Sequence, residues 1–291
     1  MGNVKFDDYL KNNIARLAQE EKRKLGYIGS APIANDLVNL LDQLNIILLE
    51  TPIESDKDLP SFSAAILYSE NQKLTFIGLN TADYYDNQLF SLAHELYHYF
   101  AKSGYHLSRI NDEKNNQLEL EANYFAAEFI LPKDELLNIV INEFKTKTLK
   151  NVDQHIIVRF IARIYCKWWL PYNYLIEELY EIKAITKEQR TELLEFDVRS
   201  NDSNFAKICN AINTDSFSLL NSKTKKNSTS PEIIEIIIKN FEDNLISEDE
   251  FEQILQMFNL SPRNFGYESE IAQEDIDEFE SFFNGAIKDE N

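Results

Sequence analysis

Two histidines and a glutamate stand at a spacing that could bind a metal ion and activate a water molecule. They are His94, Glu95 and His98, in the order H-E-x-x-H. On an α-helix, residues four apart share one face, so the two histidines could direct their imidazoles at one ion. Glu95 is turned by about 100° from His94 on the helical wheel and could reach a water beside that ion. Zn2+ suits such ligands and lowers the pKa of a bound water to about 7, so a nearby carboxylate can take the proton as the water attacks a carbonyl carbon.

The motif supports this chemistry only on a helix. Residues 87–101 contain no Gly or Pro and carry apolar residues at helical spacing, which predicts a helix over the whole motif. The alternative is a chance match, which a chain of this length gives in about one case in a hundred.

A catalytic zinc ion keeps three protein ligands and one open position, so a third ligand is needed. Residues 118–132 indicate a second helix, ended by Pro132, that carries three candidate glutamates. On the helical wheel, Glu119 falls inside the apolar arc, whereas Glu121 and Glu128 lie at its margin. A carboxylate that faces the core is costly unless it is paired or binds a metal ion. Glu119 is therefore the predicted third ligand and Glu121 the reserve, while Glu128 fits a solvated position better.

One further residue of this second helix could support the site. Asn123 lies one turn after Glu119 and could hydrogen-bond a metal ligand from the second shell.

Together the two segments resemble a known family. HELYH followed by ELEANYFAAEFILP looks like the ImmA/IrrE-type metallopeptidases, a branch of the zincins, and the resemblance is strongest from about residue 30 to 135. Glu119-x-x-Ala122-Asn123 also resembles the glutamate-ligand helix of thermolysin-like enzymes. The resemblance implies an α+β zincin-like domain with a small antiparallel sheet, a zinc ion and endopeptidase activity. It also implies a regulatory protein substrate, often a helix-turn-helix repressor encoded nearby.

Two points stay open at this stage. Tyr105 and His106 follow the motif and could stabilise the transition state at a scissile carbonyl, although a solvated loop histidine is the simpler reading of His106. The whole chain could also be a non-catalytic interaction protein, such as a toxin–antitoxin or phage-related component of a mobile genetic element, that keeps the fold and the metal. Substrate cleavage would separate these two functions, and metal analysis would not.

Several elements must position the motif. Apolar spacing predicts helices over residues 6–25 and 33–44, a short strand over 46–49, and a hairpin from 63–68 and 74–79. The resemblance gives the strand near residues 76–80 the place beside the metal helix, where an exposed edge could accept a peptide by strand addition. A closed structural hairpin is the alternative.

The sequence suggests three parts: a zincin-like catalytic domain (1–150), a helical module (151–220) and an acidic helical C-terminal region (231–291). The middle part resembles the helix-turn-helix-like module that follows the catalytic unit in this family. The module breaks at Pro171, and its second helix carries Glu177, Glu178 and Glu181, so we expect it to pack against the peptidase rather than read DNA. His155 fits a helix start better than a metal ligand. The polar residues 221–230 indicate a linker, so a chain ending near Leu220 is expected to fold.

Charge and composition restrict the remaining classes. The 291 residues carry a net charge of −20, and residues 231–291 hold 17 acidic side chains against Lys239, Arg263 and Lys288. This charge disfavours direct nucleic-acid binding, and the region is either a solvated acidic surface or a docking surface for a basic partner. No signal peptide or membrane-spanning run is evident, so a cytoplasmic location is expected. Cys166 and Cys209 are read as isolated, inert thiols.

Overall fold

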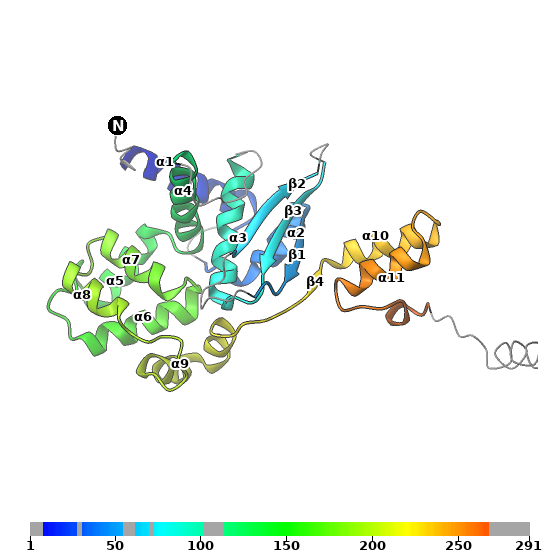
Figure 1. Cartoon of the computed structure of the whole chain (residues 1–291). Helices are drawn as coiled ribbons and strands as arrows, with labels where there is room; N and C mark the ends of the chain where they lie inside the picture. The colour runs from blue at the N-terminus through cyan, green and yellow to red at the C-terminus, as the bar shows by residue number, and fades with distance from the viewer. Residues whose placement is uncertain (1–7, 28–30, 55–61, 70–72, 102–112, 268–291) are drawn as a thin grey trace, which may run out of the picture. The chain divides into compact units, whose positions relative to one another are not determined.

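The computed structural model describes residues 8–27, 31–54, 62–69, 73–101 and 113–267. Contacts divide the chain into two compact units, Met1–Ser230 and Pro231–Asn291. The further division between residues 150 and 151 stays a prediction. The first unit is of the α+β class, as expected, with a small sheet and many helices (Figure 1).

The sheet has four strands in the order β2-β3-β1-β4. Their bounds are β1 (Ile46–Thr51), β2 (Ala64–Tyr68), β3 (Thr75–Asn80) and β4 (Ser228–Thr229). β2 and β3 form the predicted antiparallel hairpin. β1, however, runs parallel to β3, so the sheet is mixed rather than wholly antiparallel. The chain reverses direction twice between β1 and β3, and these two strands therefore run the same way.

The strand order differs from the one expected for the edge of the sheet that would face a substrate. β3 lies between β2 and β1, so the prediction that residues 76–80 form the substrate-facing edge is wrong. Among the described residues the edge beside the metal helix is β2. Backbone hydrogen bonds join Asn80 N to Ser63 O and Ser69 N to Leu74 O. In an antiparallel pair these bonds recur at every second residue, so the odd-numbered residues of β2 are the ones that hydrogen-bond to β3. Ala64, Ile66 and Tyr68 turn their backbone N–H and C=O groups away from it.

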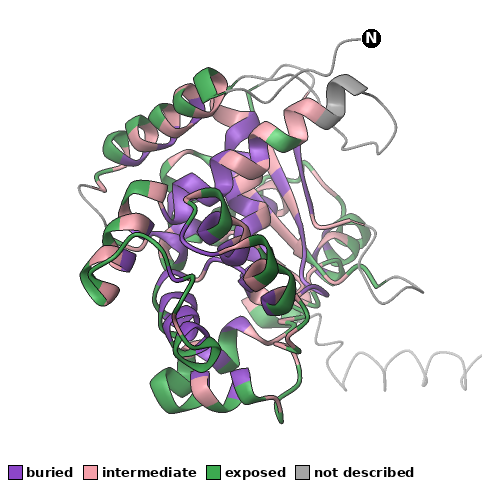
Figure 2. Ribbon diagram, turned by 90° about the vertical axis from the view of Figure 1, so that its left-hand side faces the viewer, coloured by how far each residue is buried: buried purple, intermediate pink, exposed green. Residues whose placement is uncertain are grey.

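The two predicted motif helices form and pack against each other. They are α3 (Tyr85–Phe100) and α4 (Glu113–Ile130). α3 also packs on β2 and β3, and α4 packs on α1 (Asp8–Lys24). The predicted second helix is split into a short η1 (Ala34–Asp36) and α2 (Leu37–Gln43). Buried residues concentrate in the interior between these elements, while the outer helix turns are exposed (Figure 2).

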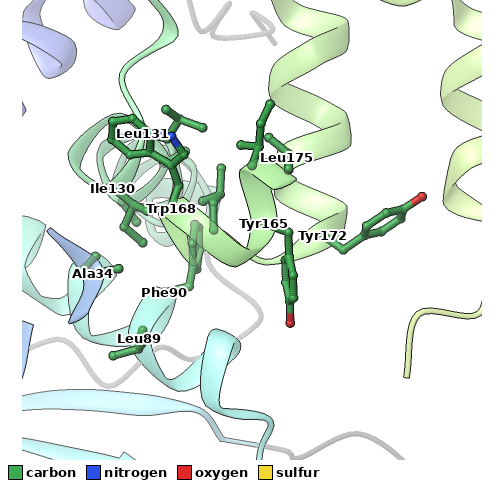
Figure 3. Packing of buried hydrophobic residues seen from close by; sticks show 14 of the residues in the cluster. Ala34, Leu89, Phe90, Ile130, Leu131, Tyr165, Trp168, Tyr172 and Leu175 are labelled. Carbon is green, nitrogen blue, oxygen red and sulfur yellow. The ribbon is translucent and has the colours of Figure 1, made fainter. Parts of the chain in front are cut away.

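The remaining helices of the first unit pack on the same core. They are α5 (Lys133–Phe144), α6 (Gln154–Trp168), α7 (Tyr172–Glu181), α8 (Lys187–Leu194) and α9 (Asn204–Leu220). Trp168 is buried, and its indole lies beside Leu131 and Ile130 (Figure 3). His155 is exposed at the start of α6, as predicted, where the Asp153 side chain accepts a hydrogen bond from its N–H.

An ion pair between a buried carboxylate and a partly exposed arginine joins the start of α3 to this later part of the chain. Asp86 is fully buried, and its two carboxylate oxygens accept hydrogen bonds from Arg199 Nη2 at 2.9 and 3.0 Å. Tyr165 of α6 donates a third, at 3.0 Å. Two glutamates of α7 also pair with neighbouring elements: Glu178, which is buried, with Lys133, and Glu181, which is exposed, with Lys11. These contacts favour a packing role for α7 over a role in DNA recognition.

Residues 221–230 are not a free linker. Ser222 O accepts from Tyr85 N, Lys225 N donates to Thr81 O, and β4 then pairs antiparallel with β1. The polar side chains that suggested a loop are used in this docking, since Ser228 Oγ donates to Glu50 and Thr229 Oγ1 donates to Leu48 O at 3.0 Å.

This docking changes where the chain can be shortened. We expect a chain ending at Ser230 to unfold at the same urea concentration as the first unit of the full chain. A chain ending at Leu220 loses hydrogen bonds worth about 1 kcal/mol each, a total on the order of 3–5 kcal/mol. Urea unfolding of the two shortened chains measures this difference. Equal midpoints would show that the docked segment adds no stability.

The second unit has a small core of its own. It contains α10 (Pro231–Glu242), α11 (Glu248–Gln256) and η2 (Pro262–Phe265). Ile237, Phe251 and Leu255 are buried, and the rings of Phe241 and Phe251 stack with centroids 4.3 Å apart. Across the described part of both units, every helix is too short or too polar to cross a membrane.

Candidate metal centre

α3 presents the two histidines of the motif side by side. Their four-residue spacing on one helix places His94 Nε2 3.2 Å from His98 Nε2. The His98 side chain is 1% exposed and that of His94 is 12% exposed. The two imidazole nitrogens are thus held close together, and both side chains have little exposure to solvent.

α4 brings Glu119 to the same point. One carboxylate oxygen lies 3.1 Å from His94 Nε2, and the other lies 3.7 Å from His98 Nε2. One ligand atom from each of the three residues can be chosen so that all lie within 4.8 Å of one another. Tetrahedral zinc, with bonds of about 2.0–2.2 Å, places its ligand atoms about 3.3–3.6 Å apart. The spacing of the three side chains therefore fits a zinc ion.

The electrostatics of the cluster also favour a cation. Burial lowers the pKa of His94, but the hydrogen bond to Glu119 and the negative charges of Glu95 and Glu119 outweigh it, so this pKa is raised. A positive charge at this point is therefore stabilised, whether it is carried by a proton or by a metal ion.

Asn123 orients the first histidine. Its Oδ1 lies 2.9 Å from His94 Nδ1, and this hydrogen bond places the imidazole proton on Nδ1. Nε2 then has its lone pair directed at the cluster, as a metal-binding histidine requires. The structure thus places Asn123 where a supporting residue was predicted.

Glu95 lies beside the cluster and is held by the sheet. It is 3% exposed, and Ile66 N of the edge strand β2 donates to its Oε2 at 3.0 Å. Burial, opposed by the charge of His94, raises the pKa of the Glu95 carboxyl to about 7. A carboxylate with such a pKa is suited to exchange protons near neutral pH. The Ile66 contact has no signature in the sequence, because it depends on how the hairpin packs on α3.

Glu121, the reserve ligand, does not join the cluster. Glu121 accepts hydrogen bonds from Tyr97 Oη at 2.6 Å and from Gln117 at 2.9 Å, and it is outside the three-residue cluster. Tyr105 and His106 fall in residues 102–112, outside the described residues.

The prediction that Glu128 is solvated is wrong. It was expected to be solvated, but it is 4% exposed, and its Oε2 accepts a hydrogen bond from Lys133 N. Burial raises the pKa of its carboxyl. The helical wheel placed Glu128 at the margin of the apolar arc, and the lysine-bearing start of α5 covers that margin.

Comparison with known proteins finds a family match for part of the chain. Residues 43–160 match the family model described as the IrrE N-terminal-like domain of peptidase M78, and this range contains every residue of the cluster. No curated protein matches the sequence. A solved structure described as a Mycobacterium tuberculosis transcriptional regulator is similar with 15% identity and a TM-score of 0.33. The match covers 57% of this chain and only 45% of that protein, and it is too weak to support an argument.

Proposed function

Because residues 43–160 match the IrrE N-terminal-like domain of peptidase M78, we propose that this chain is a zinc-dependent endopeptidase of the ImmA/IrrE type that cleaves a regulatory protein. The observation that supports this most directly is that His94, His98 and Glu119 come together, with His98 buried and the other two partly exposed, and that the buried Glu95 lies beside them. The proposed target is a helix-turn-helix repressor, on the strength of the resemblance to ImmA-type enzymes.

In this proposal His94, His98 and Glu119 hold the metal ion and Glu95 is the general base. A bound zinc ion supplies a Lewis acid and lowers the pKa of a water ligand to about 7. Glu95 takes the proton of the attacking water and can pass it to the leaving amine. The Ile66 N–H holds one oxygen of the base, so the other oxygen is available for the water.

The edge strand β2 is the proposed place for the substrate backbone. Ala64 turns its backbone N–H and C=O, and Ile66 its C=O, away from β3, while the Ile66 N–H bonds Glu95, and the edge packs on α3. An extended peptide that added to this edge would pass alongside Glu95. The base would then lie next to the bond it helps to cleave.

Metal content tests the ligand set. We expect the purified chain to bind one zinc ion and His98→Ala to lose most of it, because removal of one of three ligands leaves an incomplete site. His155→Ala, which changes an exposed histidine on α6, is the matched control and should bind zinc like the wild type. Elemental analysis after dialysis gives the result.

Two glutamate variants test the choice of third ligand. Glu119→Gln should lose metal, whereas Glu121→Gln should keep it. The reverse result would assign the ligand to Glu121. Near-stoichiometric zinc in His98→Ala would contradict the proposed site altogether.

A further inference from the structure

Glu121 and Tyr97 make a contact between the two ligand-bearing helices that the proposed chemistry does not use. Tyr97 lies on α3 between Glu95 and His98, and it is 6% exposed. Its hydroxyl donates to Glu121 Oε2 of α4 at 2.6 Å, and Gln117 Nε2, one turn earlier on α4, donates to the other carboxylate oxygen at 2.9 Å. The buried Tyr97 hydroxyl thus bonds to the Glu121 carboxylate, which Gln117 in turn holds in place.

The contact lies on the opposite flank of α4 from the metal cluster. Successive helix residues are turned by about 100°, so Glu119 and Glu121 are about 200° apart on α4. Asn123 returns to the flank of Glu119, where it meets His94. The buried Ala122 and Phe125 face inward between the two flanks. α4 is therefore held on both sides of its line of contact with α3.

Tyr97 also touches the cluster through its ring. Its centroid lies 5.9 Å from that of His98 in an edge-on arrangement and 5.5 Å from that of Phe125. The Tyr97 ring thus packs against His98 on α3, while its hydroxyl bonds Glu121, which lies two residues after Glu119 on α4. A rotation of α4 about its axis would break the Tyr97 hydrogen bond and withdraw Glu119 from His94 and His98.

We infer that Tyr97 and Glu121 are positioning residues, which fix the rotation of α4 and so hold Glu119 at the distance that completes the metal site. The inference rests on the proposed metal site and adds a determinant of its affinity. Residues that orient metal ligands typically change metal affinity by about 10–100-fold when they are replaced.

Metal affinity of matched variants tests the inference. We expect Tyr97→Phe, which keeps the ring and removes only the hydroxyl, to raise the Kd for Zn2+ by about 10–100-fold. Glu121→Ala should give the same loss, and the double variant should be no weaker than either, because all three lack the same hydrogen bond. Glu121→Gln should bind near the wild-type value, since its amide oxygen still accepts from Tyr97 and the Gln117 amide can turn its own oxygen toward it.

Tyr99→Phe is the control for loss of a tyrosine hydroxyl on α3. The Tyr99 hydroxyl reaches Leu44 O at 3.5 Å and makes no hydrogen bond to the side chains of α4 that the structure describes, so its removal should leave the Kd unchanged. Loading with Co2+ gives a second readout, because its visible spectrum reports ligand geometry. We expect an altered spectrum in Tyr97→Phe and an unaltered one in Tyr99→Phe, which a general loss of stability would not produce.

Two failures can be told apart. A wild-type chain that binds neither Zn2+ nor Co2+ would contradict the proposed function. A wild-type chain that binds tightly, with a Tyr97→Phe variant of equal Kd and identical Co2+ spectrum, would overturn the positioning inference alone. Equal losses in Tyr97→Phe and Tyr99→Phe would also overturn it.

Discussion

Replacement of Glu95 by Gln is expected to leave the metal bound and to reduce peptide cleavage by about 10²–10⁴-fold, the usual effect of removing a general base. Glu95 is outside the cluster of His94, His98 and Glu119, so the metal should be unaffected. The amide keeps the size of the side chain and can still accept from Ile66 N–H through its oxygen. It cannot take a proton from water. The measurement is cleavage of a co-expressed candidate repressor, together with zinc content.

Glu20→Gln is the matched control for this experiment, because it changes a half-exposed glutamate on α1. It should cleave at the wild-type rate. A Glu95→Gln variant with an unchanged rate would exclude Glu95 as the base. If the wild type itself cleaves none of the candidate partners while it binds zinc, the interaction-protein alternative gains support.

The second large effect is expected at the pair of Asp86 and Arg199. Arg199→Met should lower the free energy of unfolding by about 3–5 kcal/mol, because it leaves the fully buried Asp86 carboxylate without its charged partner. The double variant Asp86→Asn/Arg199→Met should recover part of this loss, since it removes the unpaired charge as well. Urea unfolding of the three chains gives the comparison.

Arg163→Met is the control, because the Arg163–Glu143 pair is about half exposed. Exposed pairs contribute about 0–1 kcal/mol, so little change is expected. A loss in Arg199→Met no larger than in Arg163→Met would show that the Asp86–Arg199 pair does not hold α3 to the later helices.

The sequence predicted best what depends on one helix or one hairpin. The spacing of His94 and His98 and the helical wheel around Glu119 depend on a period of 3.6 residues, which neighbours in sequence determine. The structure brings these three side chains together, and the hairpin of β2 and β3 also forms as predicted.

What the sequence did not predict depends on contacts between distant segments. The parallel pairing of β1 with β3, the docking of residues 221–229 and the burial of Glu128 are each decided by elements that lie elsewhere in the chain. Periodicity shows which face of an element is apolar, but it does not show which element covers that face. Polar residues such as Ser228 and Thr229 suggest a loop until a strand edge is found for them.

The pairing of β4 with β1 has a consequence for synthesis of the chain. Ser228 meets Glu50 across 178 residues, so the outer edge of β1 has no partner strand until the ribosome has added that length. At about 5–20 residues per second, this takes roughly 10–35 s. During that time the nascent sheet presents unpaired backbone groups of the kind that promote association between chains. Mutations that weaken the late strand should therefore reduce the yield of soluble protein more than they reduce the stability of the finished fold.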